Sequence, residues 1–145
     1  MTRYLTRQQI FDKAVGGVIA QGGASIRFDG ARYEYGPAGT EASCQYRSGP
    51  TDTERSCAVG QLIDDRFYDP NLEGEVVDHG DGILFTKILP SINLDRDMDF
   101  ITKLQICHDQ ATENAVNDTD FLHSFRSAAK EVGEDYNLTT EILDA

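Results

Sequence analysis

CQYRSGPTDTERSCAVG, residues 44–60, is the stretch that decides how the middle of this chain folds. Its centre, residues 48–54, is built from Ser, Gly, Pro, Thr, Asp and Glu, a composition that favours a chain reversal. The segments on either side, residues 44–47 and 55–59, have the length of short strands. We therefore predict a small antiparallel hairpin that brings its two cysteines close together.

The segment before this hairpin predicts a helix and another strand pair. Thr6 is followed three residues later by Gln9, a capping-box pattern, and Gly22-Gly23 ends the apolar repeat. That repeat consists of Ile10, Phe11, Ala14, Val15, Val18 and Ile19. The internal pair Gly16-Gly17 weakens a helix, so we expect another segment to approach it closely. Residues 26–35 alternate around Asp29-Gly30, as in a hairpin.

Helical periodicity dominates the rest of the chain. Residues 58–63 predict a short helix, and a longer one begins near Asp95. The longer helix places Met98, Ile101, Leu104 and His108 on one side and Phe100, Cys107 and Ala111 on the next. A last helix begins at Asp118 or Thr119 and stops at Gly133. Its apolar residues are Phe121, Leu122, Phe125, Ala128, Ala129 and Val132.

These elements define the expected fold class. A chain of 145 residues has the length of one domain. We predict an α+β fold in a single compact domain, residues 1–138, mostly helical, with four to five helices and a small antiparallel hairpin. Residues 139–145 are expected to be a frayed tail.

The composition and the first residues indicate where in the cell this protein is found. No stretch is apolar enough to span a membrane, and the first residues lack the apolar region of a secretory leader. We expect a cytoplasmic protein whose three cysteines are mostly free thiols.

The net charge of −12 is unevenly distributed. Residues 1–47 contain six Lys and Arg against four Asp and Glu, whereas residues 48–145 contain seven against twenty-one. Such acidity disfavours direct binding to nucleic acid, because that affinity comes largely from Lys and Arg at phosphates. An acidic surface is typical either of a well-solvated protein or of a docking face for a basic partner.

The chain contains the motif Cys44-Gln45-Tyr46-Arg47, then Cys57-Ala58-Val59-Gly60-Gln61-Leu62-Ile63, and later Leu104-Gln105-Ile106-Cys107-His108-Asp109. These segments resemble the C-x-Y-R…C-A-V-G-x-L-I core and the L-Q-x-x-H-D segment of a family of small uncharacterised bacteriophage and prophage proteins. This chain differs in a longer segment 26–42 and in lacking Trp. The resemblance implies a viral origin, hence the host-cell cytoplasm, and no agreed activity.

The residues are compatible with three kinds of chemical site. Zinc would take its ligands from Cys44, Cys57, Cys107 and either His79 or His108, although no C-x₂₋₄-C knuckle is present. A thiol enzyme would use Cys57 near a helix start as nucleophile. Its base and orienting carboxylate would be either the pair His108 and Asp109 or the pair His79 and Asp81. Core packing explains the same cysteines and His108 equally directly.

Paired carboxylates are the third kind of site. Asp64-Asp65 or the triplet Asp95, Asp97 and Asp99 would hold Mg²⁺ or perform acid–base chemistry. Alternate residues of a helix do not share a face, so the triplet is better explained by compensation of the helix dipole. Arg47 and Arg55 are expected to pair with nearby carboxylates, among them Glu54, Asp64 and Asp65.

We expect binding rather than catalysis. The densest acidic segment is the predicted docking face for a basic, host-derived protein; it contains Asp64, Asp65, Asp69, Glu73, Glu75, Asp78 and Asp81. No cofactor is expected, with zinc the alternative. A homodimer is compatible with the sequence, and the alternative function is a thiol-dependent enzyme or a zinc-stabilised module centred on Cys44, Cys57 and His108.

Overall fold

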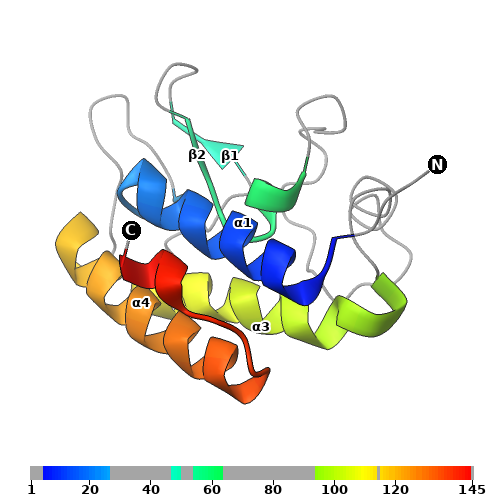
Figure 1. Cartoon of the computed structure of the whole chain (residues 1–145). Helices are drawn as coiled ribbons and strands as arrows, with labels where there is room; N and C mark the ends of the chain where they lie inside the picture. Colours follow the sequence, from blue (N-terminus) through cyan, green and yellow to red (C-terminus); the bar gives the residue numbers. More distant parts are fainter. Residues whose placement is uncertain (1–4, 27–46, 50–53, 64–93, 114, 145) are drawn as a thin grey trace.

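One helix near the start of the chain organises the fold. A computed structural model describes residues 5–26, 47–49, 54–63, 94–113 and 115–144 (Figure 1). The elements are α1 (Arg7–Gln21), β1 (Arg47–Ser48), β2 (Arg55–Ser56), the 3₁₀ helix η2 (Gly60–Leu62), α3 (Leu94–Glu113), α4 (Asp118–Asp135) and the 3₁₀ helix η5 (Glu141–Asp144). Helix α1 contacts β2 and η2 on one side and α3, α4 and η5 on the other, while α3 packs along α4. The fold is a compact, mostly helical α+β arrangement, as predicted.

Helix α1 forms where its local signals place it. The Thr6 hydroxyl accepts a hydrogen bond from the Gln9 N–H at 3.1 Å, and the Gln9 side chain accepts one from the Thr6 N–H at 2.9 Å. Gly22 ends the helix in the left-handed region, with φ 90°. All six residues of its predicted apolar stripe are buried. The prediction for this helix is confirmed at both ends.

The helices α3 and α4 complete the core with aromatic side chains. Phe100, Phe121 and Phe125 are almost completely buried, and the last two stack with ring centroids 5.5 Å apart. The described residues contain three α-helices and two short 3₁₀ helices, so the predicted count of four to five helices is slightly too high for α-helices. The short helix predicted after Ala58 is η2.

The predicted end of α4 at Gly133 is wrong. The helix continues to Asp135, and the chain reverses at Asn137, whose φ is 57°. A Cβ at Gly133 would lie 2.8 Å from a Thr140 methyl and 3.1 Å from the Phe11 ring. Glycine at this position therefore permits close packing and does not terminate the helix.

The hairpin exists but is shorter than expected. Arg47 pairs with Ser56 and Ser48 with Arg55 in an antiparallel ladder of two residues per strand. Cys57 follows β2 directly and lies outside the ladder. Cys44 lies outside the described residues, and so does the other predicted strand pair, residues 26–35, apart from Ile26, which is buried and not in a strand.

The expectation of a frayed tail is corrected for residues 139–144. Leu143 is buried, and the Gln8 side chain pairs with Thr139 by accepting from its N–H at 2.9 Å and donating to its carbonyl at 3.1 Å. Ile142 lies against Gly16, where a Cβ would come within 2.8 Å of its side chain. A second close contact, from Gln61, occupies the position beside Gly17, so the predicted approach to Gly16-Gly17 is confirmed.

Hydropathy in the described helices agrees with the sequence. None of the helices in this part of the chain is long and apolar enough to cross a bilayer.

Candidate functional site

His108, one of the residues singled out from the sequence, lies beside the hairpin in a buried polar network. His108 on α3 is completely buried. Its Nε2 accepts a hydrogen bond from the Ser25 backbone N–H at 3.0 Å, and its Nδ1 lies 3.1 Å from Asp109 Oδ1. The His108 and Phe121 rings form a T-shaped pair, with centroids 5.3 Å apart.

These contacts determine which nitrogen of His108 carries the proton. An Nε2 that accepts from a backbone N–H must present its lone pair, so the proton of the neutral ring is on Nδ1 and is donated to Asp109. Both nitrogens are therefore engaged within the protein. The arrangement resembles the base-and-carboxylate pair of a catalytic site, but its accepting nitrogen is occupied by the main chain.

Gln105 connects this pair to the segment after the hairpin. Its side-chain oxygen accepts from the Val59 N–H at 3.0 Å, and its nitrogen donates to Asp109 Oδ1 at 2.9 Å. Asp109 Oδ1 is thus shared by Gln105 and His108. Because Gln105 is itself buried, these bonds satisfy polar groups that would otherwise lose water without compensation.

Two further amide side chains, those of Gln21 and Gln61, hold β2 against α1. Gln21 accepts from the Ser56 N–H at 2.8 Å and donates to the Ser56 carbonyl at 2.9 Å, as a neighbouring strand would. Gln61 donates to Gln21 at 2.9 Å and to the Ser56 carbonyl at 3.0 Å. Side chains from α1 and η2 thus satisfy the main-chain N–H and carbonyl of Ser56.

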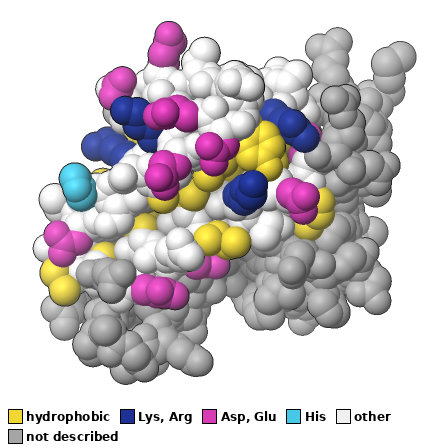
Figure 2. Space-filling model, turned by 90° about the horizontal axis from the view of Figure 1, so that it is seen from below, with side chains coloured by type: hydrophobic (Ala, Val, Ile, Leu, Met, Phe, Trp, Pro, Cys, Tyr) yellow, Lys and Arg dark blue, Asp and Glu magenta, His cyan; other side chains and the backbone are white. Residues whose placement is uncertain are grey.

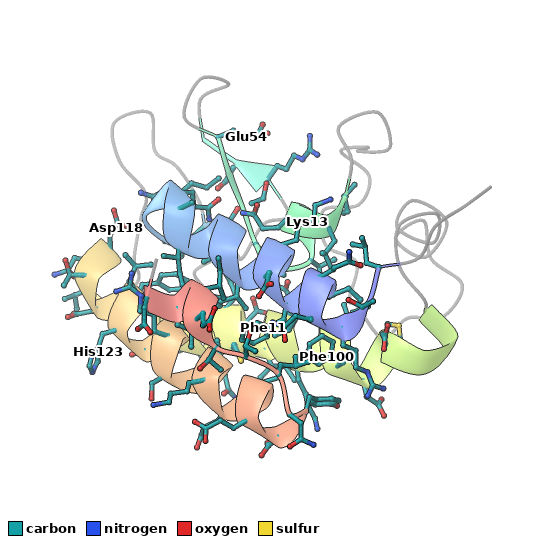
Figure 3. All side chains as sticks on the ribbon, viewed as in Figure 1. Phe11, Lys13, Glu54, Phe100, Asp118 and His123 are labelled. Atoms are coloured by element: carbon teal, nitrogen blue, oxygen red, sulfur yellow. The ribbon has the colours of Figure 1, made fainter. Side chains whose placement is uncertain are left out.

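Arg55 links the hairpin to α4. Its guanidinium makes two parallel 3.0 Å bonds to the Asp118 carboxylate and a 3.3 Å bond to the Ala24 carbonyl. Asp118 occupies the first turn of α4, beside the end of α1 (Figure 3), where a negative charge is also favoured by the helix dipole. The predicted pairing of Arg47 with Glu54 is long, at 4.0 Å, and Arg47 also donates to the Ile63 carbonyl at 3.0 Å.

The two described cysteines are buried free thiols. The Cys57 sulfur accepts from the Gly60 N–H at 3.4 Å, a contact within its own turn. Burial raises the pKa of the Cys107 thiol to about 11, and the Glu131 carboxylate adds to the rise against a backbone hydrogen bond that lowers it. Cys107 is therefore a neutral thiol at physiological pH. Both environments match the packing interpretation of these cysteines.

The metal candidates are not assembled in the part that the structure describes. No group of three or more His, Cys, Asp or Glu side chains with metal-binding geometry occurs among those residues. Cys44 and His79 lie outside them. In the aspartate triplet, buried Asp97 pairs with Arg7 at 2.8 Å, Asp99 is exposed, and the Asp95 side chain is not described.

The predicted acidic docking face, Asp64 to Asp81, and the alternative pair of His79 and Asp81 lie outside the described residues. Acidic side chains are nevertheless frequent in the described surface. From α4 onward they are Asp118, Asp120, Glu131, Glu134, Asp135, Glu141 and Asp144, against Arg126 and Lys130. Figure 2 shows acidic side chains interspersed with Lys and Arg around an apolar band on the face seen from below.

Sequence reasoning missed the neutral members of this network, Ser25, Gln21 and Gln105. The one available signal was position, since Gln105 falls between Leu104 and Cys107 on the buried side of α3.

Comparison with known proteins adds no relative. Scans against protein-family models, curated proteins and solved structures find no significant match to this chain.

Proposed function

We propose that this chain is a small acidic accessory protein of bacteriophage type that acts by binding a basic protein, a factor of the host cell. The observation that carries the proposal is the charge distribution, with seven Lys and Arg against twenty-one Asp and Glu in residues 48–145. The cluster Asp64 to Asp81 is the densest part of this charge. A field of this sign accelerates encounter with a cationic surface and weakens as salt screens it.

The structure of the polar network supports binding over thiol catalysis. A general base needs a free nitrogen within reach of the proton that it removes. The accepting nitrogen of His108 is instead bonded to the Ser25 N–H, and Cys57 is 1% exposed. These residues support the fold, so the described part of the chain favours packing over thiol catalysis, and the charge distribution is the feature that favours a binding role.

The test is a capture experiment with the tagged full chain. The protein is incubated with bacterial lysate at low and moderate salt, and bound proteins are identified by mass spectrometry. We expect one stoichiometric basic partner whose capture declines as salt rises. The partner is then purified, and its affinity is measured directly.

A pair of variants separates local docking from net charge. Asp64→Lys, Asp65→Lys and Glu73→Lys together reverse three charges in the predicted face, and Glu131→Lys, Glu134→Lys and Asp135→Lys reverse three exposed charges on α4. The first triple variant should lose capture, and the second should retain most of it. Equal capture by the first variant and the wild type would refute the assignment of this face.

A further inference from the structure

One hydrogen bond connects His108 on α3 to the segment after α1, which in turn holds the hairpin. His108 Nε2 accepts from the Ser25 N–H at 3.0 Å. The Ser25 hydroxyl shares a 2.9 Å hydrogen bond with the Ser48 hydroxyl and donates to the Arg55 carbonyl at 3.2 Å. We propose that the bond between Ser25 and His108 is an acid-sensitive latch, which protonation of His108 opens, so that Ser25 is released and the hairpin is loosened.

The latch is closed only while the His108 ring is neutral. Nε2 accepts with its single lone pair, and Nδ1 already carries the proton that it donates to Asp109 at 3.1 Å. A second proton, taken up from solvent, goes to Nε2 and turns this nitrogen into a donor. Two N–H groups would then face each other across 3.0 Å, so the bond to Ser25 is lost.

The contacts of Asp109 determine which side of the latch moves. Asp109 lies on the same helix as His108, and a carboxylate binds an imidazolium more strongly than a neutral ring. The Gln105 side chain donates to the same carboxylate oxygen at 2.9 Å and holds it in place. The charged ring therefore stays with α3, and Ser25 is the partner that leaves.

The charges around the latch separate its titration from that of other groups. In the described part of the chain, hydrogen bonds place Asp109 of α3 beside His108, and the paired side chains of Arg55 and Asp118 join the hairpin to α4. Helix α4 presents the neutral Phe121 ring to the histidine. Carboxyl groups ordinarily titrate near pH 4 and histidine near pH 6.5. Between pH 7 and pH 5, histidine is therefore the member of this set whose charge changes.

The test is hydrogen exchange of the full chain between pH 7 and pH 5, followed for single amides by NMR. Opening of the latch takes up one proton, so the Ser25 protection factor should fall by about tenfold per pH unit below about pH 6.5. The Ser56 amide, which Gln21 holds at 2.8 Å, should lose protection by a smaller factor because the hairpin is loosened. The amide of buried Ala129 on α4 reports global unfolding and should keep its protection.

Two glutamine variants identify the group that titrates. His108→Gln retains an oxygen that can accept from the Ser25 N–H and does not titrate, so its Ser25 protection should be independent of pH. His123→Gln removes an exposed histidine of α4 and should behave as wild type does. If His108→Gln does not fold, imidazole ¹⁵N spectra of the wild type decide. Nε2 of His108 should gain its proton over the pH range in which Ser25 loses protection.

Four results overturn the proposal. They are constant protection of Ser25 to pH 5, constant protection of Ser56, equal losses at Ser25 and Ala129, and a pH dependence in His108→Gln equal to that of wild type. In the wild-type spectra, an Nε2 that stays unprotonated while Ser25 loses protection also overturns it. The latch is independent of the proposed function, because capture of a basic partner is tested at pH 7, where the latch is closed. Failure of one proposal therefore leaves the other intact.

Discussion

His108 shows how one residue that looks catalytic can instead serve the fold. We predict that His108→Ala lowers the free energy of unfolding by about 2–4 kcal/mol, because it leaves a cavity and a buried Ser25 N–H without its acceptor. Urea denaturation at pH 7 measures the change. The matched control is His123→Ala, an exposed histidine on α4, which should stay within about 0.5 kcal/mol of wild type. Equal losses in the two variants would contradict a structural role for His108.

Ionisation of Cys107 makes the stability of the fold depend on pH. Its pKa is raised from 9.0 to about 11 in the folded state, so the unfolded chain loses the thiol proton first. Below pH 9 the thiol is neutral in both states, and stability is highest. As pH rises from 9 to 11 the unfolded chain ionises first, which lowers the free energy of unfolding by roughly 2–3 kcal/mol.

The contribution of Cys107 is measured as the difference in unfolding free energy between wild type and a variant without the thiol. Wild type and Cys107→Ala are unfolded in urea at pH 7, 9 and 10.5, and the stability advantage of wild type should shrink at the two higher values. Groups that titrate in both proteins cancel in this comparison. An advantage that stays constant to pH 10.5 would show that the folded thiol is not protected from ionisation.

At the scale of elements, Gly133 separates packing from helix propensity. Gly133→Ala should destabilise the protein by about 1–3 kcal/mol, because the added methyl overpacks the junction of Phe11 and Thr140. Propensity alone predicts the opposite sign, a gain of about 1 kcal/mol. Thermal unfolding decides between them. Ser127→Ala, at an exposed position of the same helix, is the control and should leave the melting temperature unchanged or slightly raised.

The same contrast explains how much of the fold the sequence revealed. Helix α1 was predictable at both ends because its capping box and its terminal glycine act within a few residues. The end of α4 and the docking of the tail were not, because Gly133 and Gly16 serve partners far along the chain. Their signals became visible only once Phe11 and Ile142 were placed beside them.

The residues of the candidate site also fall into those that the sequence reveals and those that it does not. Cysteine and histidine attract attention from their chemistry alone, so His108 and Cys57 were identified as candidates before their contacts were known. Gln21 and Gln105 were missed, because an amide in a helix has the same appearance in sequence whether it faces water or a buried backbone N–H. What distinguishes them is burial, which depends on how α1 and α3 meet the hairpin.

At the scale of the whole molecule, the net charge of −12 opposes the compact state through self-repulsion. We predict that raising NaCl from about 10 mM, where the Debye length is about 30 Å, to about 150 mM, where it is about 8 Å, raises the melting temperature at pH 7. The variant Glu131→Lys, Glu134→Lys and Asp135→Lys changes the net charge by +6, from −12 to −6, and should show a smaller rise. A melting temperature that falls with salt would mean that ion pairs such as Arg55–Asp118 outweigh the repulsion. The acidic surface would then stabilise this fold, and its charge would count for structure rather than for a basic partner.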